Sequence, residues 1–312
     1  MGHTTATFRA SDGLELATYA WTPDDAAPRA VVQLAHGMAE HAARYDHVAR
    51  ALVAEGYAVY AHDHRGHGRT AKTDEELGWC AERDGWDQAV RDLHDLTMHW
   101  RAQHPGLPLA LVAHSMGSFM AQQALILHGK DYDAVALSGS NGKGGALLAA
   151  GGIVARAERR RLGPRGRSKL LNFMSFGSFN NAFKPARTDF DWLSRDPAQV
   201  DKYIADPRCG FLVTTQFWVD FLRGLQFIEQ PEHQARVPSG LPLYIFAGSE
   251  DPVSQRTKGL RQLLDAYQKA GLTRVEHRFY PGARHETFNE TNRDEVIRDL
   301  LAWMGRALPA KP

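Results

Sequence analysis

Short, almost wholly apolar segments alternate with amphipathic ones along the first half of the chain, and this alternation constrains the fold most. Segments such as AVVQLA (residues 30–35) and LPLALVA (residues 107–113) are short enough for strands and lack the apolar–polar alternation of a half-exposed strand. Between them, apolar residues recur at helical spacing, as over residues 45–53 before Gly56. Because each strand is apolar on both faces, we expect an α/β fold whose mostly parallel central sheet is flanked by helices on both sides.

The same pattern recurs further along the chain. Strands are expected at residues 58–62, 134–139, 241–248 and 274–280, and helices around 86–100, from 116, around 260–267 and over 295–308. Near the N-terminus, residues 5–21 alternate about the turn Ser11-Asp12-Gly13, which predicts an antiparallel hairpin at the edge of the sheet.

The alternation stops after the sixth predicted strand, near Asn141, and resumes at residue 241. The interval is helical in pattern and rich in aromatic residues. We therefore expect an α/β core of residues 1–140 and 231–312, interrupted by a mainly helical insertion of residues 141–230, which we call the cap. An insertion at this point would lie over the carboxyl edge of the sheet, where open α/β sheets bind ligands. The alternative is that its aromatic residues form only the cap's own small core.

Composition excludes several classes of function. Lys and Arg number 37 and Asp and Glu 36, so the net charge of +1 offers no general field for nucleic acid. The N-terminus lacks the features of a secretory signal, and no apolar run is long enough to span a bilayer, so we expect a cytoplasmic protein. Cys80 and Cys209 form no CxxC-type spacing, which argues against sulfur-based redox or zinc chemistry. The sequence does not indicate an oligomeric state.

A serine lies at the joint between a predicted strand and a predicted helix. In AHSMGS (residues 113–118), Ser115 occupies the centre of a small-x-Ser-x-Gly motif, with Ala113 in place of the usual first glycine. G-x-S-x-G places a serine on a tight strand-to-helix turn, where small residues on either side avoid collisions. This position predicts a nucleophile, with a structurally placed serine as the alternative.

A serine nucleophile needs a base and an acid, which in this arrangement follow it along the chain in the order acid, then histidine. Asp251 follows the strand at 241–248, and His285 follows the strand at 274–280, so both fall where the order requires. Glu250 is the competing acid. His277 is the competing base, although it lies inside a predicted strand.

The tetrahedral intermediate needs two backbone N–H donors. We expect them from Met116, the residue after the serine, and from Met38, which follows His36-Gly37 at the end of an early strand. For His36 we favour a packing role behind that loop over a role as catalytic base.

Two further patterns have functional and ordinary interpretations. HDHRGH (residues 62–67) places His62, His64 and His67 close together, as in some metallohydrolases, but the closing Asp-His pair of that pattern and a second ligand cluster are missing. We favour a structural loop and expect no metal. The basic run Arg156–Lys169 could contact anionic lipid headgroups transiently, or it could be a solvated helix face.

Taken together, the segments HGMAEHAARYD (36–46), DHRGHGRT (63–70), AHSMGS (113–118), GSEDPVS (248–254) and GARHE (282–286) resemble the α/β-hydrolase superfamily. Within it, the chain is similar to the monoacylglycerol lipase and lysophospholipase group of serine hydrolases. The resemblance implies the α/β-hydrolase fold and hydrolysis of carboxylic esters by Ser115, His285 and Asp251. It also implies oxyanion donors at Met38 and Met116, no cofactor, and a small-molecule ester or lipid substrate whose acyl chain lies under the cap. A peptidase or an acyltransferase can use the same triad.

The resemblance also suggests substrate contacts. Glu40 and Arg44 match positions near the alcohol pocket of monoacylglycerol lipases, although an ion pair that fixes their loop is an equal alternative. The other expected contacts are aromatic residues: Phe179, Phe217, Phe221 and Phe288. Phe288 stands where some monoacylglycerol lipases place a histidine facing the glycerol.

Overall fold

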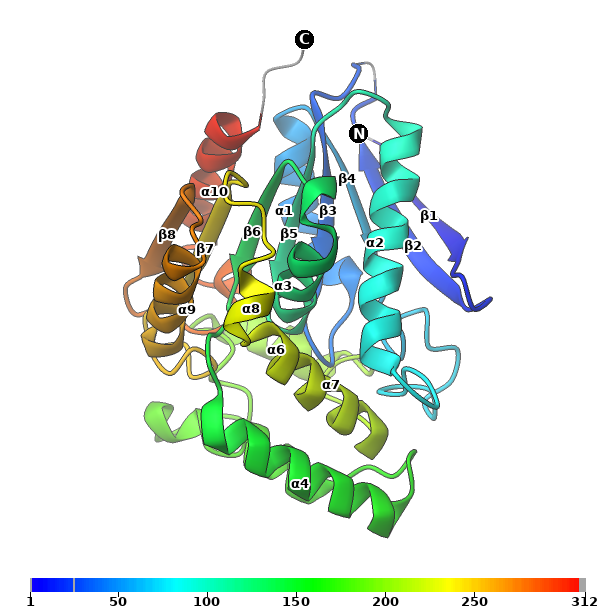
Figure 1. Cartoon of the computed structure of the whole chain (residues 1–312), viewed down its shortest axis with the longest axis vertical. Coiled ribbons are helices and arrows are strands. Elements are labelled where there is room, and N and C mark those ends of the chain that lie inside the picture. The colour runs from blue at the N-terminus through cyan, green and yellow to red at the C-terminus, as the bar shows by residue number, and fades with distance from the viewer. Residues whose placement is uncertain (1, 25, 309–312) are drawn as a thin grey trace.

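An eight-stranded sheet runs through the centre of the computed structural model, which describes residues 2–24 and 26–308 (Figure 1). The strands are β1 (Gly2–Arg9), β2 (Glu15–Thr22), β3 (Ala30–Ala35), β4 (Tyr57–His62), β5 (Leu109–His114), β6 (Ala134–Ser138), β7 (Leu243–Gly248) and β8 (Val275–Tyr280). Their order across the sheet is β1-β2-β4-β3-β5-β6-β7-β8. All neighbours from β4 to β8 are parallel, whereas β1 and β2 are antiparallel to each other and β2 is antiparallel to β4. The predicted mostly parallel sheet and its edge hairpin are therefore confirmed.

Five long helices cover the two faces of this sheet. They are α1 (Asp46–Ala54), α2 (Gly85–Gln103), α3 (Met116–His128), α9 (Lys258–Lys269) and α10 (Arg293–Ala307). The apolar cluster on one face includes residues of α2, α3 and α9, and the cluster on the other face includes residues of α1 and α10 (Figure 1). Each buried strand contributes to both clusters because successive side chains point to opposite faces. In β3, Val31 joins the first cluster and Val32 the second.

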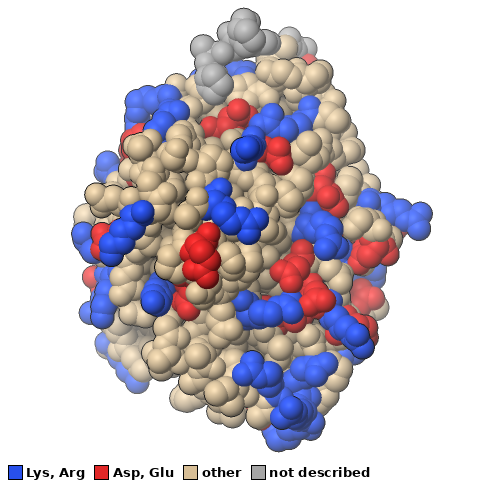
Figure 2. Space-filling model, in the orientation of Figure 1, with Lys and Arg blue, Asp and Glu red and all other residues tan. Residues whose placement is uncertain are grey.

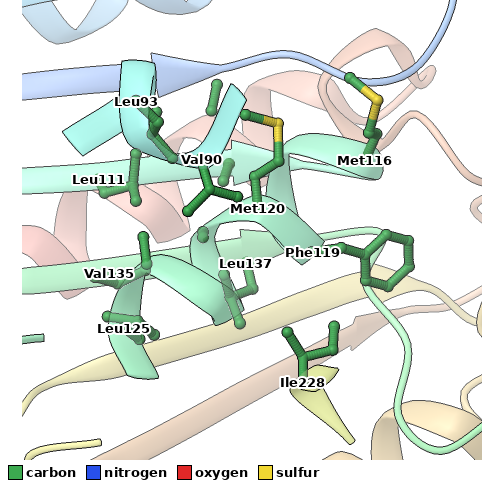
Figure 3. Close-up of a cluster of buried hydrophobic side chains, with 14 of the residues drawn as sticks. Val90, Leu93, Leu111, Met116, Phe119, Met120, Leu125, Val135, Leu137 and Ile228 are labelled. Carbon is green, nitrogen blue, oxygen red and sulfur yellow. The ribbon is translucent and has the colours of Figure 1, made fainter. Parts of the chain in front are cut away.

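The packing between α2, α3 and the central strands fixes the start of α3. Figure 3 shows Leu93 of α2, Leu111 of β5 and Leu137 of β6 in one cluster with Met120 of α3. All four side chains are inaccessible to solvent, at 0% exposure. Truncating such a residue to alanine costs about 2–5 kcal/mol, so this packing holds the residue just before α3 firmly at the end of β5.

Helices also fill the chain between β6 and β7. These are α4 (Gly145–Leu162), α5 (Lys169–Phe176), α6 (Pro197–Ala205) and α7 (Thr215–Ile228), followed by the short α8 (Pro231–Gln234). Figure 1 shows α4 lying across one end of the molecule, with α7 between α4 and the helices on the sheet. The division of the chain at residues 141 and 230 into two domains remains a prediction.

Side-chain caps define where three of these helices begin. Ser168 Oγ accepts from the Leu171 N–H over 3.1 Å, and Asp196 and Thr214 cap α6 and α7 in the same way. Within residues 2–24 and 26–308, no helix has both the length and the apolar character needed to cross a membrane.

Candidate active site

Ser115 occupies a strained turn between β5 and α3. Its backbone has φ 50° and ψ −119°, a conformation that L-residues rarely adopt and that costs roughly 1–3 kcal/mol. The Ser115 N–H donates to the Ser138 carbonyl over 2.9 Å, which ties the turn to β6. A Cβ atom at Gly117 would lie 2.4 Å from the Ala35 carbonyl oxygen, so this position requires glycine. Ala113, two residues before the serine, fits inside the core at 1% exposure.

The structure brings Ser115, His285 and Asp251 into contact. His285 Nδ1 lies 3.0 Å from Asp251 Oδ1, and His285 Nε2 lies 2.9 Å from Ser115 Oγ. Because a carboxylate only accepts, the neutral ring carries its hydrogen on Nδ1, so Nε2 is left to accept from the serine hydroxyl. Asp251 follows β7 and His285 follows β8, as the chain order predicts.

The environment of His285 favours its role as a base. Burial by itself would lower the pKa of His285, but the charge of Asp251 and the hydrogen bond to it raise that pKa above the usual histidine value. The ring of Trp192 packs 5.2 Å from the imidazole, centroid to centroid, and the His285 N–H donates to the Trp192 carbonyl over 3.3 Å. The His285 ring is therefore held from both the sheet side and the cap side.

The two competing residues lie outside this group. The Glu250 carboxylate pairs with Arg256 over 3.1 Å, with both side chains more than a third exposed. His277 lies within β8, where its ring packs against Phe279. Neither residue reaches the serine.

Met38 and Met116 border the cavity together with Ser115. Among the described residues, no group accepts a hydrogen bond from the backbone N–H of either methionine. The loop that carries Met38 is held from the cap, because the Ala39 carbonyl accepts from the Gly210 N–H over 2.9 Å and from the Tyr203 hydroxyl over 3.0 Å. These two unused donors suit an oxyanion beside Ser115 Oγ.

A cavity of about 640 Å³ opens onto Ser115, and most of the residues that line it are apolar, many of them aromatic residues of the cap. Its volume lies within the range of small-molecule sites. The aromatic residues that line it are Phe119, Phe173, Phe176, Phe179, Phe190, Trp192, Tyr203, Phe211, Trp218 and Phe221. Phe179 and Phe221 both border this cavity, and their contact with a substrate remains a prediction.

Glu40 and Arg44 form part of a buried ion-pair network. Arg44 Nη1 donates to Glu40 Oε2 over 2.5 Å, and both Nη atoms donate to the Glu286 carboxylate over 2.7 Å. Glu40 Oε1 also accepts from the Gly37 N–H over 2.5 Å and from the Tyr45 hydroxyl over 2.8 Å. Glu40 borders the cavity, whereas Arg44 lies behind it. This geometry favours the loop-fixing interpretation of the pair.

Two of the predicted substrate contacts, Phe217 and Phe288, lie away from the cavity, so the structure does not support these two predictions. Phe288 is 3% exposed and packs on the opposite face of the sheet, 5.4 Å from Phe246 and 6.3 Å from Tyr45 between ring centroids. Phe217 is 5% exposed and lies next to His67, one helical turn before Phe221 on the same side of α7, and its ring packs on the Phe221 ring in the apolar cluster of the core. Neither residue borders the cavity.

The sequence interpretation did not single out several residues of the site. Trp218, Leu222 and Leu225 follow one another at spacings of four and three along α7 and line the cavity. That helical spacing was the available signal. Glu286 gave no local signal, because its partner Arg44 lies 242 residues away.

The histidines proposed as alternative metal ligands are engaged with each other. His62 Nε2 and His64 Nδ1 lie 3.0 Å apart, and all three of His62, His64 and His67 are at most 1% exposed. In the described part of the chain, the sets of three close potential ligand atoms belong to His41, Asp206 and Cys209 and to His94, His128 and Asp131. The HDHRGH string therefore gives no support to the metallohydrolase alternative.

Comparison with known proteins points in one direction. A family model described as "Serine aminopeptidase, S33" matches residues 26–292. A monoacylglycerol lipase of Mycolicibacterium smegmatis is 32% identical over 302 residues, which cover 95% of each chain. A monoglyceride lipase of Rattus norvegicus is 27% identical over 305 residues, covering 96% of this chain and 89% of that one. Among solved structures, a thermostable carboxyl esterase of Bacillus coagulans in complex with glycerol superposes with a TM-score of 0.90 at 27% identity, covering 98% of this chain and 99% of that one.

Proposed function

Because the chain belongs to the serine aminopeptidase family of α/β-hydrolases, we propose that it hydrolyses monoacylglycerols and similar single-chain esters through an acyl-enzyme formed on Ser115. The predicted resemblance to the α/β-hydrolases is confirmed, and the protein is a serine hydrolase that acts on carboxylic esters. The finer assignment of substrate and of residue roles is our proposal. The observation that carries it is the aromatic cavity that opens onto Ser115 Oγ beside His285.

In the proposed mechanism, the Ser115 hydroxyl attacks the ester carbonyl while His285 Nε2 takes its proton. Asp251 keeps the hydrogen of the ring on Nδ1 and stabilises the imidazolium that forms. The N–H groups of Met38 and Met116 donate to the oxyanion of the tetrahedral intermediate. His285 then returns the proton to the leaving alcohol, and a water molecule activated by the same base releases the acid.

The acyl chain is proposed to lie against the aromatic residues of the cap. Burying one methylene group contributes about 0.8 kcal/mol, which corresponds to roughly a fourfold gain per carbon when the burial persists in the transition state. The carboxylates beside the triad, Glu40 and Glu286, are both paired with Arg44. Most of the residues that line the rest of the cavity are apolar, which favours an ester with an uncharged chain.

The test combines variants with a series of substrates. Ser115→Ala and Asp251→Asn should lose activity on nitrophenyl esters and monoacylglycerols, whereas Glu250→Gln, the matched change at the neighbouring acid, should retain it. The kcat/KM of the wild-type protein should rise with acyl length until the cavity is filled. Activity that survives Ser115→Ala, or a rate that is flat across the acyl series, would refute the proposal.

We also propose that the outer face of the cap touches anionic membrane surfaces transiently. Figure 2 shows Lys and Arg side chains gathered at the end of the molecule where α4 lies in Figure 1. Large apolar side chains are exposed on the same helices: Leu147 at 82% and Ile153 at 63% on α4, and Phe173 at 69% on α5. Exposed apolar groups beside cations suit the surface of an anionic bilayer.

The basic run itself divides into two parts. Arg167 donates to the carbonyls of Asp74 and Leu77, and Arg165 lies over the Trp79 ring, so both join the cap to the core. Arg156 and Arg160 are exposed on α4. Replacing both by glutamine should weaken binding to vesicles of anionic lipid and reduce its salt dependence. The same changes at two exposed basic residues near the start of β8, at the opposite edge of the sheet from the cap, Lys269 and Arg274, should not. Equal effects from both pairs would contradict this contact.

A further inference from the structure

Three buried histidines lie behind the loop that carries Met38, and the mechanism does not use them. His36 follows β3 directly, His62 ends β4, and His64 lies two residues further on. Each of these three histidines is only 1% exposed to solvent. Polar rings buried to this degree are normally retained only where their hydrogen bonds are made.

All three rings are neutral near pH 7. Burial lowers the pKa of His62 to about 3, and burial together with the neighbouring imidazoles holds the pKa values of His36 and His64 well below the usual range. A neutral imidazole has one N–H donor and one bare nitrogen acceptor. The contacts of each ring can therefore be assigned a direction.

The direction of one hydrogen bond is certain, because a backbone N–H can only donate. The His64 N–H points at His36 Nε2 over 3.0 Å, so Nε2 accepts and the hydrogen of His36 sits on Nδ1. That Nδ1–H donates to the Gly37 carbonyl over 2.8 Å. His36 is thus fixed in one tautomer by two backbone groups.

The same logic extends to the other two rings. His64 Nε2 faces the His36 carbonyl over 3.2 Å and must donate, which leaves His64 Nδ1 bare. His62 Nε2 lies 3.0 Å from that nitrogen and so donates to it. His62 Nδ1 then carries no hydrogen, and it is among the few buried side-chain atoms without a partner in the described residues. These bonds form a directed chain from His62 to the Gly37 carbonyl, in which the His62 ring donates to the His64 ring and the backbone N–H of His64 donates to the His36 ring. The His64 ring itself donates to the backbone carbonyl of His36.

The end of this chain determines where the Met38 N–H points. The Gly37–Met38 peptide is trans, so its N–H lies opposite its C=O. The preceding peptide is fixed as well, because the Gly37 N–H donates to Glu40 Oε1 over 2.5 Å. With the Gly37 carbonyl held toward His36, the Met38 N–H is turned away from the histidines. Met38 borders the cavity, and its N–H has no acceptor among the described residues.

We propose that His36, supported by His64 and His62, is a positioning residue that aims the Met38 N–H at the oxyanion by holding the Gly37 carbonyl. This inference rests on the proposed function, since it concerns an intermediate formed on Ser115. The histidines act through the backbone and touch neither substrate nor the reacting atoms.

Two substitutions at His36 separate the two hydrogen bonds of the ring. In His36→Asn, the amide lies near the place of Nδ1 and can still donate to the Gly37 carbonyl. In His36→Gln, the amide lies near the place of Nε2 and can accept from the His64 N–H but not reach Gly37. We expect kcat to fall roughly 10- to 100-fold in His36→Gln with KM nearly unchanged, somewhat less than the loss of a whole oxyanion donor. His36→Asn should stay within about threefold of the wild-type protein.

A second readout distinguishes positioning from a general structural defect. An alkyl trifluoromethyl ketone forms a tetrahedral adduct with a serine nucleophile, so its Ki should weaken in His36→Gln by the same factor as kcat/KM. The control is His67→Gln, a change at an equally buried histidine whose Nδ1 bonds the Arg65 carbonyl outside the chain. That variant should keep both kcat and Ki even where its melting temperature falls.

The outcomes separate this inference from the proposed function. If Ser115→Ala remains active, the proposed function fails. If Ser115→Ala is inactive but His36→Gln matches the wild-type protein, or if His36→Asn and His36→Gln lose equal activity, the positioning role is overturned. Loss of kcat in His36→Gln without a matching change in Ki would overturn it too.

Discussion

Replacing Arg44 by methionine should destabilise the fold strongly, because the change leaves two buried carboxylates without their shared cation. The side chains of Arg44, Glu40 and Glu286 are only 11%, 3% and 6% exposed. Removing one partner from a buried ion pair costs about 3–5 kcal/mol, since the remaining charge is neither solvated nor paired. Methionine retains much of the apolar volume of arginine, so loss of packing contributes little. We expect the free energy of unfolding at neutral pH to fall by at least about 3 kcal/mol.

The pH dependence of this loss identifies its cause. Without the cation, the two buried carboxylate charges are poorly solvated and repel each other, so neutralising them with protons favours the folded state. The native variant then binds more protons than its unfolded state, so its stability decreases as the pH rises. The difference in stability between the wild-type protein and the Arg44→Met variant should therefore shrink as the pH is lowered from about 7 to about 5.

Urea unfolding followed by tryptophan fluorescence measures both effects. The matched control is Arg50→Met, which removes the same side chain from the surface pair with Asp46, where the two partners are 50% and 41% exposed. That control should change stability little. A loss in Arg44→Met no larger than in Arg50→Met, or one independent of pH, would refute the electrostatic account of this network.

Three further predictions follow from the site and its surroundings. Burial lowers the pKa of His285, but the charge of Asp251 and the hydrogen bond to it raise this pKa by more, so the net shift is upward. The value of kcat/KM should therefore fall on acidification with a midpoint above pH 6.5, and a midpoint at or below pH 6.5 would contradict this. Gly117→Ala places a Cβ atom 2.4 Å from the Ala35 carbonyl oxygen, so fluorophosphonate labelling of the folded variant should be nearly lost, and labelling at the normal rate would show that the turn can relax. Burial lowers the pKa of His67 to about 4, so between about pH 6.5 and 4 the unfolded chain binds a proton that the native state does not bind, and acid destabilises the fold. The His67→Gln variant should lack up to about 3 kcal/mol of this destabilisation when urea unfolding is measured over the same pH range. An unchanged dependence of stability on pH would count against this prediction.

The sheet could be predicted from sequence because its signals are local. Each buried strand is a short apolar run, and the position of Ser115 between a strand and a helix is visible in a window of a few residues. Asp251 and His285 could be placed because loops after neighbouring parallel strands meet at one edge of the sheet. Their order along the chain was therefore enough to predict that the two side chains lie close to Ser115, although a sequence contains no distances.

The remaining parts of the site depend on contacts that no local pattern encodes. Phe217 and Phe221 lie on the same helix, and only the packing of α7 on the core decides that Phe221 faces the cavity while Phe217 does not. Phe288 follows His285 by three residues, yet it lies in a short helical turn whose side chain packs in the apolar cluster on the other face of the sheet. The hydrogen bond from the Tyr203 hydroxyl to the Ala39 carbonyl connects two residues that are 164 positions apart in the sequence.

The attachment of the cap to the loops of the site restricts how a substrate can enter. The carbonyls of Trp192 and Leu193 receive the N–H groups of His285 and Glu286, and Gly210 donates to Ala39. A hinged movement of the whole insertion would pull the loops of His285 and Met38 away from Ser115. A substrate that enters while Ser115 and His285 stay in contact is therefore expected to pass along the α5 side of the cavity, where Phe173 lines the cavity and is 69% exposed.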